Sequence, residues 1–256
     1  MSMDVIIPMA GLGTRFSRIG INYTPKPLIE INGKRLVEWA ISSLGIEGTY
    51  HFVIPDTFTS SYERVLMDIA SKYVDKYHVY RTKPTRGALE TSVVPFVHNN
   101  IIRHSGNNEL VITNCDQFTP WNINSFLDFK NSRVDLDAIV TTYNHQPITV
   151  GETYPYSFIK LNESGYGVEV SEKYAISENV LCGIHYWRDA KDFLTSATDT
   201  LSIDEDDLGT NEYYLSTSFN SLIGSGMRVG IYKLEDHEFY SLGSPEEIDK
   251  NLSALV

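Results

Sequence analysis

Cysteine is scarce in this chain of 256 residues, which carries only Cys115 and Cys182. Two cysteines by themselves cannot form a disulfide framework or supply a zinc site. A chain of this length also buries a large core, so it needs no such cross-link to fold. The cysteine content therefore fits the reducing cytoplasm, which is where we expect the protein to reside.

Long apolar runs are also missing. The run at the N-terminus, from Val5 to Ala10, is interrupted by Pro8, whereas a membrane span needs about 20 apolar residues. No basic stretch precedes an apolar segment in the way that a signal peptide requires. We therefore expect no membrane partner and no export.

Basic residues are outnumbered, with 21 lysines and arginines against 33 aspartates and glutamates, for a net charge of −12. Binding of nucleic acid needs a basic face that neutralises phosphates, so we expect no such partner. The deficit is uneven, because residues 1–40 hold five basic and three acidic groups, whereas residues 151–215 hold four basic and thirteen acidic groups. The basic segment at the start of the chain raises the question of which anion it binds.

The first half of the chain alternates β-branched stretches with stretches of helical spacing. This pattern predicts strands at 4–10, 50–54, 77–80 and 109–113, and helices at 35–44, 60–73 and 87–97. Such alternation is typical of βαβ units and a mainly parallel sheet. Pro95 lies inside the third helix and is expected to end or kink it.

The second half has more strands and fewer long helices. Strands are predicted at 138–143, 157–161, 167–170, 180–186 and 228–233, and helices near 190–197, at 212–223 and from Ser244 onward. We therefore predict an α/β fold with a Rossmann-like mixed sheet that is mainly parallel, is flanked by helices and has antiparallel additions in the second half. No linker interrupts the composition, so we expect a single domain over residues 1–256.

A glycine-rich loop, residues 11–15, follows the first predicted strand. Glycines allow backbone N–H groups to approach a phosphate closely. The dinucleotide-binding pattern needs a third glycine where Phe16 stands, and the Gly-Lys-Ser/Thr of a P-loop is absent. The loop offers instead Arg15, whose guanidinium matches phosphate oxygens. Taken alone, the loop is better explained as a surface turn with a solvated arginine.

Lys26 lies between two prolines in the segment 24–28. Each proline fixes its own backbone and holds the residue before it extended. A lysine held in this way loses less conformational entropy when it binds an anion. Taken alone, this segment too is explained by a rigid surface turn.

Together, the two segments read Gly11-Leu-Gly-Thr-Arg15 and Pro25-Lys-Pro-Leu28. They resemble the signature of the sugar-phosphate nucleotidylyltransferases, which include the glucose-1-phosphate thymidylyl- and cytidylyltransferases and their phosphocholine cytidylyltransferase relatives. Further segments resemble this family over nearly the whole chain, namely Thr85–Thr91, Val111–Asp116, Val170–Lys173, Cys182–Tyr186 and Leu242–Glu246. The resemblance implies the GT-A-like fold of these nucleotidyltransferases.

The resemblance also implies an enzyme that moves a nucleoside monophosphate from an NTP to a small phosphorylated acceptor and releases pyrophosphate. The acceptor would be a sugar 1-phosphate in a step that supplies surface-polysaccharide precursors, such as those of capsules. Residues 1–120 would form the NTP-binding half and residues 121–256 the acceptor-binding half.

The site residues follow from the same resemblance. Arg15 would neutralise the leaving pyrophosphate, Lys26 would bind the α-phosphate, and Asp116 would hold Mg²⁺. The nucleotide-binding residues would be Met9, Ala10, Gly11, Leu12, Gly13, Thr14, Thr82, Gly87 and Ala88. The acceptor-binding residues would be Asp116, Glu172, Lys173 and Gly183.

One position departs from the family pattern. Members commonly carry a second metal-binding aspartate late in the chain, and Ser218 stands at that place here. A hydroxyl is a weaker ligand for magnesium than a carboxylate. We therefore expect Mg²⁺ to be held by Asp116, the nucleotide phosphates and water, with Asn220, Ser218 or Glu212 as candidate further ligands.

Several alternatives stay open at this stage. The acceptor could be phosphocholine or another phosphorylated metabolite, and the late Ser218 would also suit a nucleotide-binding module without catalysis. A metal-dependent glycosyltransferase would normally show Asp-x-Asp, where this chain has Asn114-Cys-Asp116. Lys173 could simply pair with a neighbouring glutamate, Glu172 or Glu169. The base of the NTP and the formation of a homo-oligomer are left open by the sequence.

Overall fold

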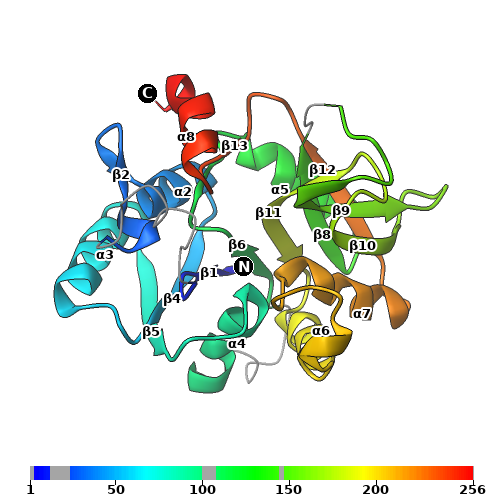
Figure 1. Ribbon diagram of the computed structural model, residues 1–256, viewed down its shortest axis with the longest axis horizontal. Coiled ribbons are helices and arrows are strands. Elements are labelled where there is room, and N and C mark those ends of the chain that lie inside the picture. The colour runs from blue at the N-terminus through cyan, green and yellow to red at the C-terminus, as the bar shows by residue number, and fades with distance from the viewer. Residues whose placement is uncertain (1–2, 12–23, 100–107, 144–146, 256) are drawn as a thin grey trace.

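A nine-stranded mixed sheet forms the centre of the molecule (Figure 1). The structure is a computed structural model, and it describes residues 3–11, 24–99, 108–143 and 147–255. Seven of the strands follow the order β10-β9-β11-β6-β1-β4-β5, and the pair of β8 and β12 joins the sheet at β11.

The parallel part of the sheet comes from the first half of the chain. Its strands are β1 (Met3–Pro8), β4 (Gly48–Pro55), β5 (Lys76–Thr82) and β6 (Leu110–Thr113). β1 pairs in parallel with β4 and β6, and β4 pairs in parallel with β5. Val5 and Ile7 enter one core and Ile6 enters the other, because successive side chains of a strand point to opposite faces. This sheet is thus buried on both sides, as is usual for parallel strands.

Two groups of helices cover the two faces. The first group is α2 (Leu36–Leu44), α3 (Ser60–Tyr73) and α5 (Ile123–Ser132). The second group is α4 (Ala88–Asn99), α6 (Ala190–Leu201) and α7 (Ser218–Gly224). Local signals set their ends: Thr59 caps the start of α3 through its side chain, and Gly45 ends α2 in the left-handed conformation.

The second half of the chain adds the antiparallel strands. These are β8 (Ala138–Tyr143), β9 (Thr153–Leu161), β10 (Gly167–Tyr174) and β11 (Val180–Trp187), and they are followed by β12 (Val229–Leu234). β11 runs antiparallel to β6 and β8, β10 runs antiparallel to β9, and β12 runs parallel to β8. The predicted α/β fold, with a mainly parallel sheet and antiparallel additions, is therefore confirmed.

Short elements complete the structure. They are η1 (Lys26–Leu28), β2 (Glu30–Ile31), β3 (Lys34–Arg35), β7 (Gln117–Phe118), η3 (Glu205–Asp207), η4 (Leu215–Thr217), β13 (Tyr240–Ser241), α8 (Pro245–Asn251) and η5 (Leu252–Ala254). In Figure 1, α8 (red) returns to the first half of the chain beside α2 and β2. Leu242, Ile248 and Leu255 share a small core there with Leu36 and Trp39. The last elements therefore belong to the packing of the first half.

The structure differs from two predictions about helices. Of the two outcomes expected at Pro95, an end or a kink, the first does not occur, since α4 continues through the proline to Asn99. The predicted helix over residues 212–223 is instead an extended stretch followed by η4 and the short α7. Tertiary contacts explain the difference, because the backbone N–H of Tyr213 bonds to Arg86 rather than to its own turn. Within the described ranges, no helix has both the length and the apolar character that a membrane span requires.

Candidate active site

Several of the predicted site residues that the structure describes lie at one edge of the sheet. Because β1, β4, β5 and β6 run parallel, their carboxyl ends meet at the same edge. β11 starts at this edge, since Ile184 pairs with Thr113 at the end of β6. In open α/β sheets, ligands bind outside the carboxyl ends of the strands. This edge is therefore the place to look for a substrate site.

Lys26 and Asp116 meet at this edge although they are far apart in the sequence. The ammonium of Lys26 lies 2.5 Å from Oδ2 of Asp116 and also donates to the carbonyl of Gly243 at 3.1 Å. The two side chains are only 18% and 19% exposed. Pro25 and Pro27 flank the lysine, and Pro27 is buried. The predicted proline-lysine segment and the predicted strand-end aspartate therefore form one charged cluster.

A second carboxylate lies next to this pair. A Cβ built on Gly243 would come within 3.2 Å of both Asp116 Oδ2 and Glu247 Oε2. Glu247 belongs to the first turn of α8, where its N–H bonds to the side chain of Ser244. Gly243 thus leaves open the space between two carboxylates. Neither Glu247 nor the Gly243 carbonyl is predicted as part of the site, although Gly243 lies in the segment Leu242–Glu246 that resembles the family.

Gly183 lies beside the residues that precede Asp116. Its φ is +80°, and a Cβ here would lie 2.1 Å from Nδ2 of Asn114. The N–H of Asn114 also donates to the carbonyl of Gly183 at 3.2 Å. The side-chain amide of Asn114 therefore rests directly over the glycine. This contact explains physically why glycine is required at this position of β11.

Glu172 lies on β10, where its carboxylate accepts hydrogen bonds from two hydroxyls, those of Ser157 and Ser216. Burial raises the pKa of this carboxyl, and the two hydroxyls oppose that shift. An acid in such surroundings can present a polar face to the hydroxyl groups of a small ligand.

Lys173 is the next residue, and it has an unusual backbone with φ of +67°. Its ammonium donates to Oδ1 of Asn211 at 3.0 Å and to the hydroxyl of Tyr214 at 2.7 Å. Within the described part of the chain, no ion pair joins Lys173 to a carboxylate. Lys173 thus makes no direct ion pair with Glu172 or Glu169, although its charge opposes the rise that burial causes in the pKa of the Glu172 carboxyl.

The glycine-led segment after β5 packs tightly against Tyr213. A Cβ on Gly87 would lie 2.4 Å from the carbonyl oxygen of Tyr213, and φ of Gly87 is +154°. The backbone of Tyr213 also donates to Arg86 at 3.0 Å and accepts from Leu89 at 3.1 Å. This segment joins the carboxyl end of β5, marked by Thr82, to the start of α4 at Ala88. The predicted residues Thr82, Gly87 and Ala88 thus lie along one connection at the carboxyl-terminal edge of the parallel strands.

The start of the glycine-rich loop follows β1 at the same edge. Met9 and Ala10 are buried, and the N–H of Met9 donates to the carbonyl of Val53 at 2.8 Å. Gly11 is the last described residue before the gap. The predicted site residues Leu12, Gly13, Thr14 and Arg15 lie outside the described residues.

The candidate further metal ligands have other partners. The hydroxyl of Ser218 is fully buried and donates to the carbonyl of Leu215. Both polar atoms of the Asn220 amide bond to the backbone of Val170 at 2.8 Å. Glu212 is exposed and lies near Glu172, whose pKa its charge helps to raise. Ser218 and Asn220 therefore support the local backbone, and their role as further metal ligands stays a prediction.

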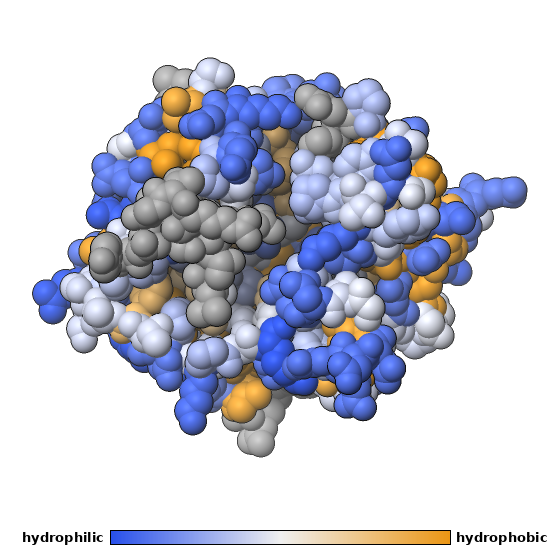
Figure 2. Space-filling view, in the orientation of Figure 1, coloured by the Kyte–Doolittle hydropathy of each residue, from blue (hydrophilic) through white to orange (hydrophobic). Residues whose placement is uncertain are grey.

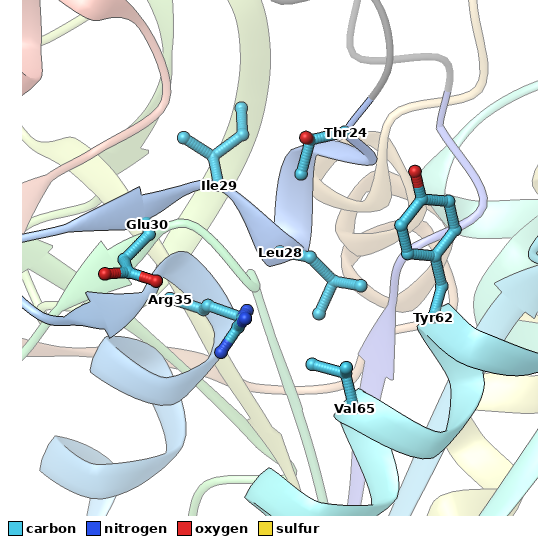
Figure 3. Close-up of a pocket in the computed structure, with 7 residues that line it drawn as sticks. All are labelled: Thr24, Leu28, Ile29, Glu30, Arg35, Tyr62 and Val65. Carbon is cyan, nitrogen blue, oxygen red and sulfur yellow. The ribbon is translucent and has the colours of Figure 1, made fainter.

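A shallow cavity of about 330 Å³ opens beside the Lys26 segment (Figure 3). Leu28 and Val65 point toward it from η1 and α3, and Tyr62 borders it. Leu28 itself is almost completely buried. Its packing anchors the turn that presents Lys26 to Asp116.

Comparison with known proteins addresses the fold. A scan against protein-family models and a search of curated proteins gave no match. A nucleoside-diphosphate-sugar pyrophosphorylase from Vibrio cholerae RC9 has a similar structure, with a TM-score of 0.78 at 19% identity, covering 97% of this chain and 99% of its own. The chain shares the fold of this protein.

Two further solved structures agree. A UDP-glucose pyrophosphorylase complexed with UDP-glucose has a TM-score of 0.74 at 18% identity and covers 100% of this chain and 98% of its own. The inositol-1-phosphate CTP transferase from T. maritima has a TM-score of 0.71 at 16% identity and covers 99% of this chain and 95% of its own. The fold implied by the sequence motifs is thus confirmed over the whole length of the chain.

Proposed function

We propose that this chain is a nucleotidyltransferase that moves a nucleoside monophosphate from an NTP to a small phosphorylated acceptor and releases pyrophosphate. The observation that carries the proposal is the contact between Lys26 and Asp116. Lys26 belongs to the Pro25–Leu28 segment of the signature, and Asp116 ends Val111–Asp116, a further segment that resembles the sugar-phosphate nucleotidylyltransferases. The shared fold of proteins that make or cleave nucleotide sugars supports the same activity.

The reaction needs alignment and charge neutralisation more than proton transfer. The acceptor phosphate is ionised at neutral pH, so it attacks the α-phosphate without a general base. In the proposal, Lys26 binds the α-phosphate and the charge that develops on it, and Arg15 stabilises the leaving pyrophosphate. Lys173 binds the acceptor phosphate, and the backbone at Ala10 and Gly11 lies against the nucleotide.

The residues present also suit a magnesium ion. Mg²⁺ is commonly held by one or two carboxylates together with the phosphates of the substrate. Asp116 and Glu247, on either side of the space that Gly243 leaves open, supply two such carboxylates. When bound, the metal would neutralise phosphate charge. The described residues contain no cluster of three or more metal-binding side chains, so the phosphates would complete the coordination.

The acceptor in this proposal is a sugar 1-phosphate. The names of two structural neighbours contain different compounds, UDP-glucose in one and inositol 1-phosphate in the other. Phosphocholine and other phosphorylated metabolites therefore belong in the same test. The cytoplasmic location and the role in surface-polysaccharide precursors remain predictions from the sequence.

The test is a screen for pyrophosphate release. The protein is incubated with Mg²⁺, each of ATP, GTP, CTP, UTP and dTTP, and a panel of sugar 1-phosphates, inositol 1-phosphate and phosphocholine. Release that depends on one NTP and one acceptor, and that the Lys26→Ala variant lacks, supports the proposal. Nucleotide binding without release for any pair would instead favour a module that binds nucleotides without catalysis.

A further inference from the structure

The stretch from Asn211 to Tyr214, called here the 211–214 segment, touches both halves of the proposed active site. It lies between η3 and η4, and its last residue has an extended backbone. Figure 2 shows hydrophilic side chains gathered over α6 and the surface beside it, close to this part of the chain. Residues 212–214 were predicted to be helical, and contacts with other parts of the chain explain why they are not.

Tyr214 and Asn211 enclose the ammonium of Lys173. The lysine donates to the Tyr214 hydroxyl and to the Asn211 amide oxygen, and its Nζ lies 4.8 Å from the centre of the Tyr214 ring. The Tyr214 hydroxyl in turn donates to the Asn211 oxygen at 3.2 Å. Every partner in this triangle is uncharged. Neutral groups therefore orient the ammonium, while its charge also reaches Glu172, where it opposes the rise that burial causes in the carboxyl pKa.

The backbone at Lys173 is also arranged to aim this side chain. The pairing of β10 with β9 shifts register between Glu172 and Tyr174, so Lys173 lies in a β-bulge. Bulges redirect a side chain and occur often beside active sites. A lysine with φ of +67° is strained, and such residues persist where their surroundings hold them. The contacts to Asn211 and Tyr214 are such a restraint.

Tyr213, which precedes Tyr214 in the chain, contacts the glycine-led segment after β5. Tyr213 bonds through its backbone to Arg86 and Leu89, and the Arg86 guanidinium stacks on its ring at 4.5 Å. Tyr213 is buried, and its hydroxyl donates to the carbonyl of Ile203 at 2.5 Å. Consecutive Cα atoms are about 3.8 Å apart. The glycine-led segment after β5, residues 83–87, is called here the nucleotide-side loop. It and Lys173 are thus joined through two adjacent residues, Tyr213 and Tyr214.

From these contacts we infer that the 211–214 segment positions Lys173 for the acceptor phosphate, with Tyr214 and Asn211 as positioning residues and Tyr213 as the link to the nucleotide-side loop. The inference rests on the proposed function. It adds that recognition of the acceptor depends on residues that need not touch it. It also requires that a change on the nucleotide-side loop alters binding of the acceptor.

The first test removes one hydroxyl. Tyr214→Phe keeps the ring but deletes the oxygen that accepts from Lys173, so the KM for the acceptor should rise about tenfold while the KM for the NTP stays within twofold. In a Lys173→Ala background the same substitution should change the acceptor KM by less than twofold, because its effect passes through the lysine. Tyr77→Phe, which removes a tyrosine hydroxyl bonded to Ser71 near the opposite edge of the sheet, is the matched control.

The second test acts from the nucleotide side. Gly87→Ala places a methyl group against the carbonyl of Tyr213 and should raise the KM for both substrates, since it displaces the segment that holds Lys173. If Tyr214→Phe leaves the acceptor KM unchanged, or if its effect is just as large without Lys173, the positioning role is overturned. If Gly87→Ala raises only the KM for the NTP, the link through Tyr213 is overturned.

A third measurement does not depend on activity. Hydrogen exchange of the Lys173 ammonium, observed by ¹⁵N NMR and assigned by its loss in Lys173→Arg, should be severalfold faster in Tyr214→Phe than in the wild type. Equal exchange rates would contradict the proposed contact. A wild type that releases no pyrophosphate with any substrate pair would overturn the proposed function, and the exchange rates would still decide whether Tyr214 holds the lysine.

Discussion

The ammonium of Lys26 and the carboxylate of Asp116 lie 2.5 Å apart, although 90 residues separate them in the chain. The contact joins a turn held between two prolines to the end of a buried strand. Each partner fixes the other, and the Gly243 carbonyl adds a third point of attachment. A charged pair held in this way is already arranged before a substrate arrives, which is the condition under which electrostatic stabilisation is most effective.

Lys26→Ala should lower kcat for pyrophosphate release by about 100-fold or more, because the variant lacks a charge aimed at the reacting phosphate. Arg15→Ala should have an effect of the same order on the leaving group. The measurement is steady-state kinetics on protein whose folding is verified by circular dichroism. Lys76→Ala, on the exposed start of β5, is the control. Near-normal turnover in either active-site variant would remove that residue from the mechanism.

Asp116→Asn and Glu247→Gln should each weaken binding of a divalent cation in the presence of NTP by about tenfold or more. The physical reason is that each substitution replaces an anionic oxygen by a neutral amide. Binding of Mn²⁺, followed by electron paramagnetic resonance, measures the affinity without turnover. Glu246→Gln changes the exposed neighbour of Glu247 and should leave the affinity as it is. An unchanged affinity in Glu247→Gln would restrict the protein ligands to Asp116.

Gly183→Ala should destabilise the fold more than Gly165→Ala. Both glycines have φ of +80°, so alanine is strained at either position, but only at Gly183 would the new Cβ meet a neighbour, the amide of Asn114. The difference between the two variants should be about 1–3 kcal/mol in the free energy of unfolding. Urea titrations of both variants measure it. Equal losses would mean that Asn114 moves away freely.

His185 should make the protein sensitive to acid. Burial lowers the pKa of its imidazole from 6.5 to about 3, so between these values the unfolded chain binds a proton that the folded chain does not. Stability therefore falls as the pH drops below 6.5. His185→Leu should reduce the loss of unfolding free energy between pH 7 and pH 4 by about 3 kcal/mol. Each protein is compared with itself at two pH values. The effect of the substitution on packing is present at both and therefore cancels from the difference in unfolding free energy.

The same substitution at the exposed His237 gives the control for this measurement. A His185→Leu variant that loses as much stability between pH 7 and pH 4 as the wild type would show that another group causes the acid sensitivity.

The main strands could be predicted because their side chains are buried on both faces. A run such as Val5-Ile6-Ile7 is apolar throughout, since alternate residues enter two different cores. The two-residue strands β7 and β13 carry no period of their own and could not be predicted. The stretch 212–223 has helical spacing, but bonds from Tyr213 to Arg86 and Leu89 hold its first part extended. In this stretch, tertiary contacts outweigh the local propensity to form a helix.

The candidate site could be predicted only in part, and for a related reason. Lys26, Asp116 and Lys173 stand in recognisable motifs, so their residue types and spacing were informative. Glu247 and Tyr214 become relevant only through what they approach in space, namely Asp116 across Gly243 and the Lys173 ammonium. Nothing in their own sequence neighbourhood indicates those partners.

The contact of the Gly243 turn with the first half of the chain has a consequence for synthesis on the ribosome. Gly243 lies 217 residues after Lys26, yet its carbonyl contacts that lysine. A growing chain in which the parallel strands, Lys26 and Asp116 have already been synthesised still lacks the turn at Leu242 and Gly243, which bonds to both residues. The charged centre is therefore completed only after Gly243 has been synthesised, and a chain that stalls before this turn would carry both motifs without a finished site.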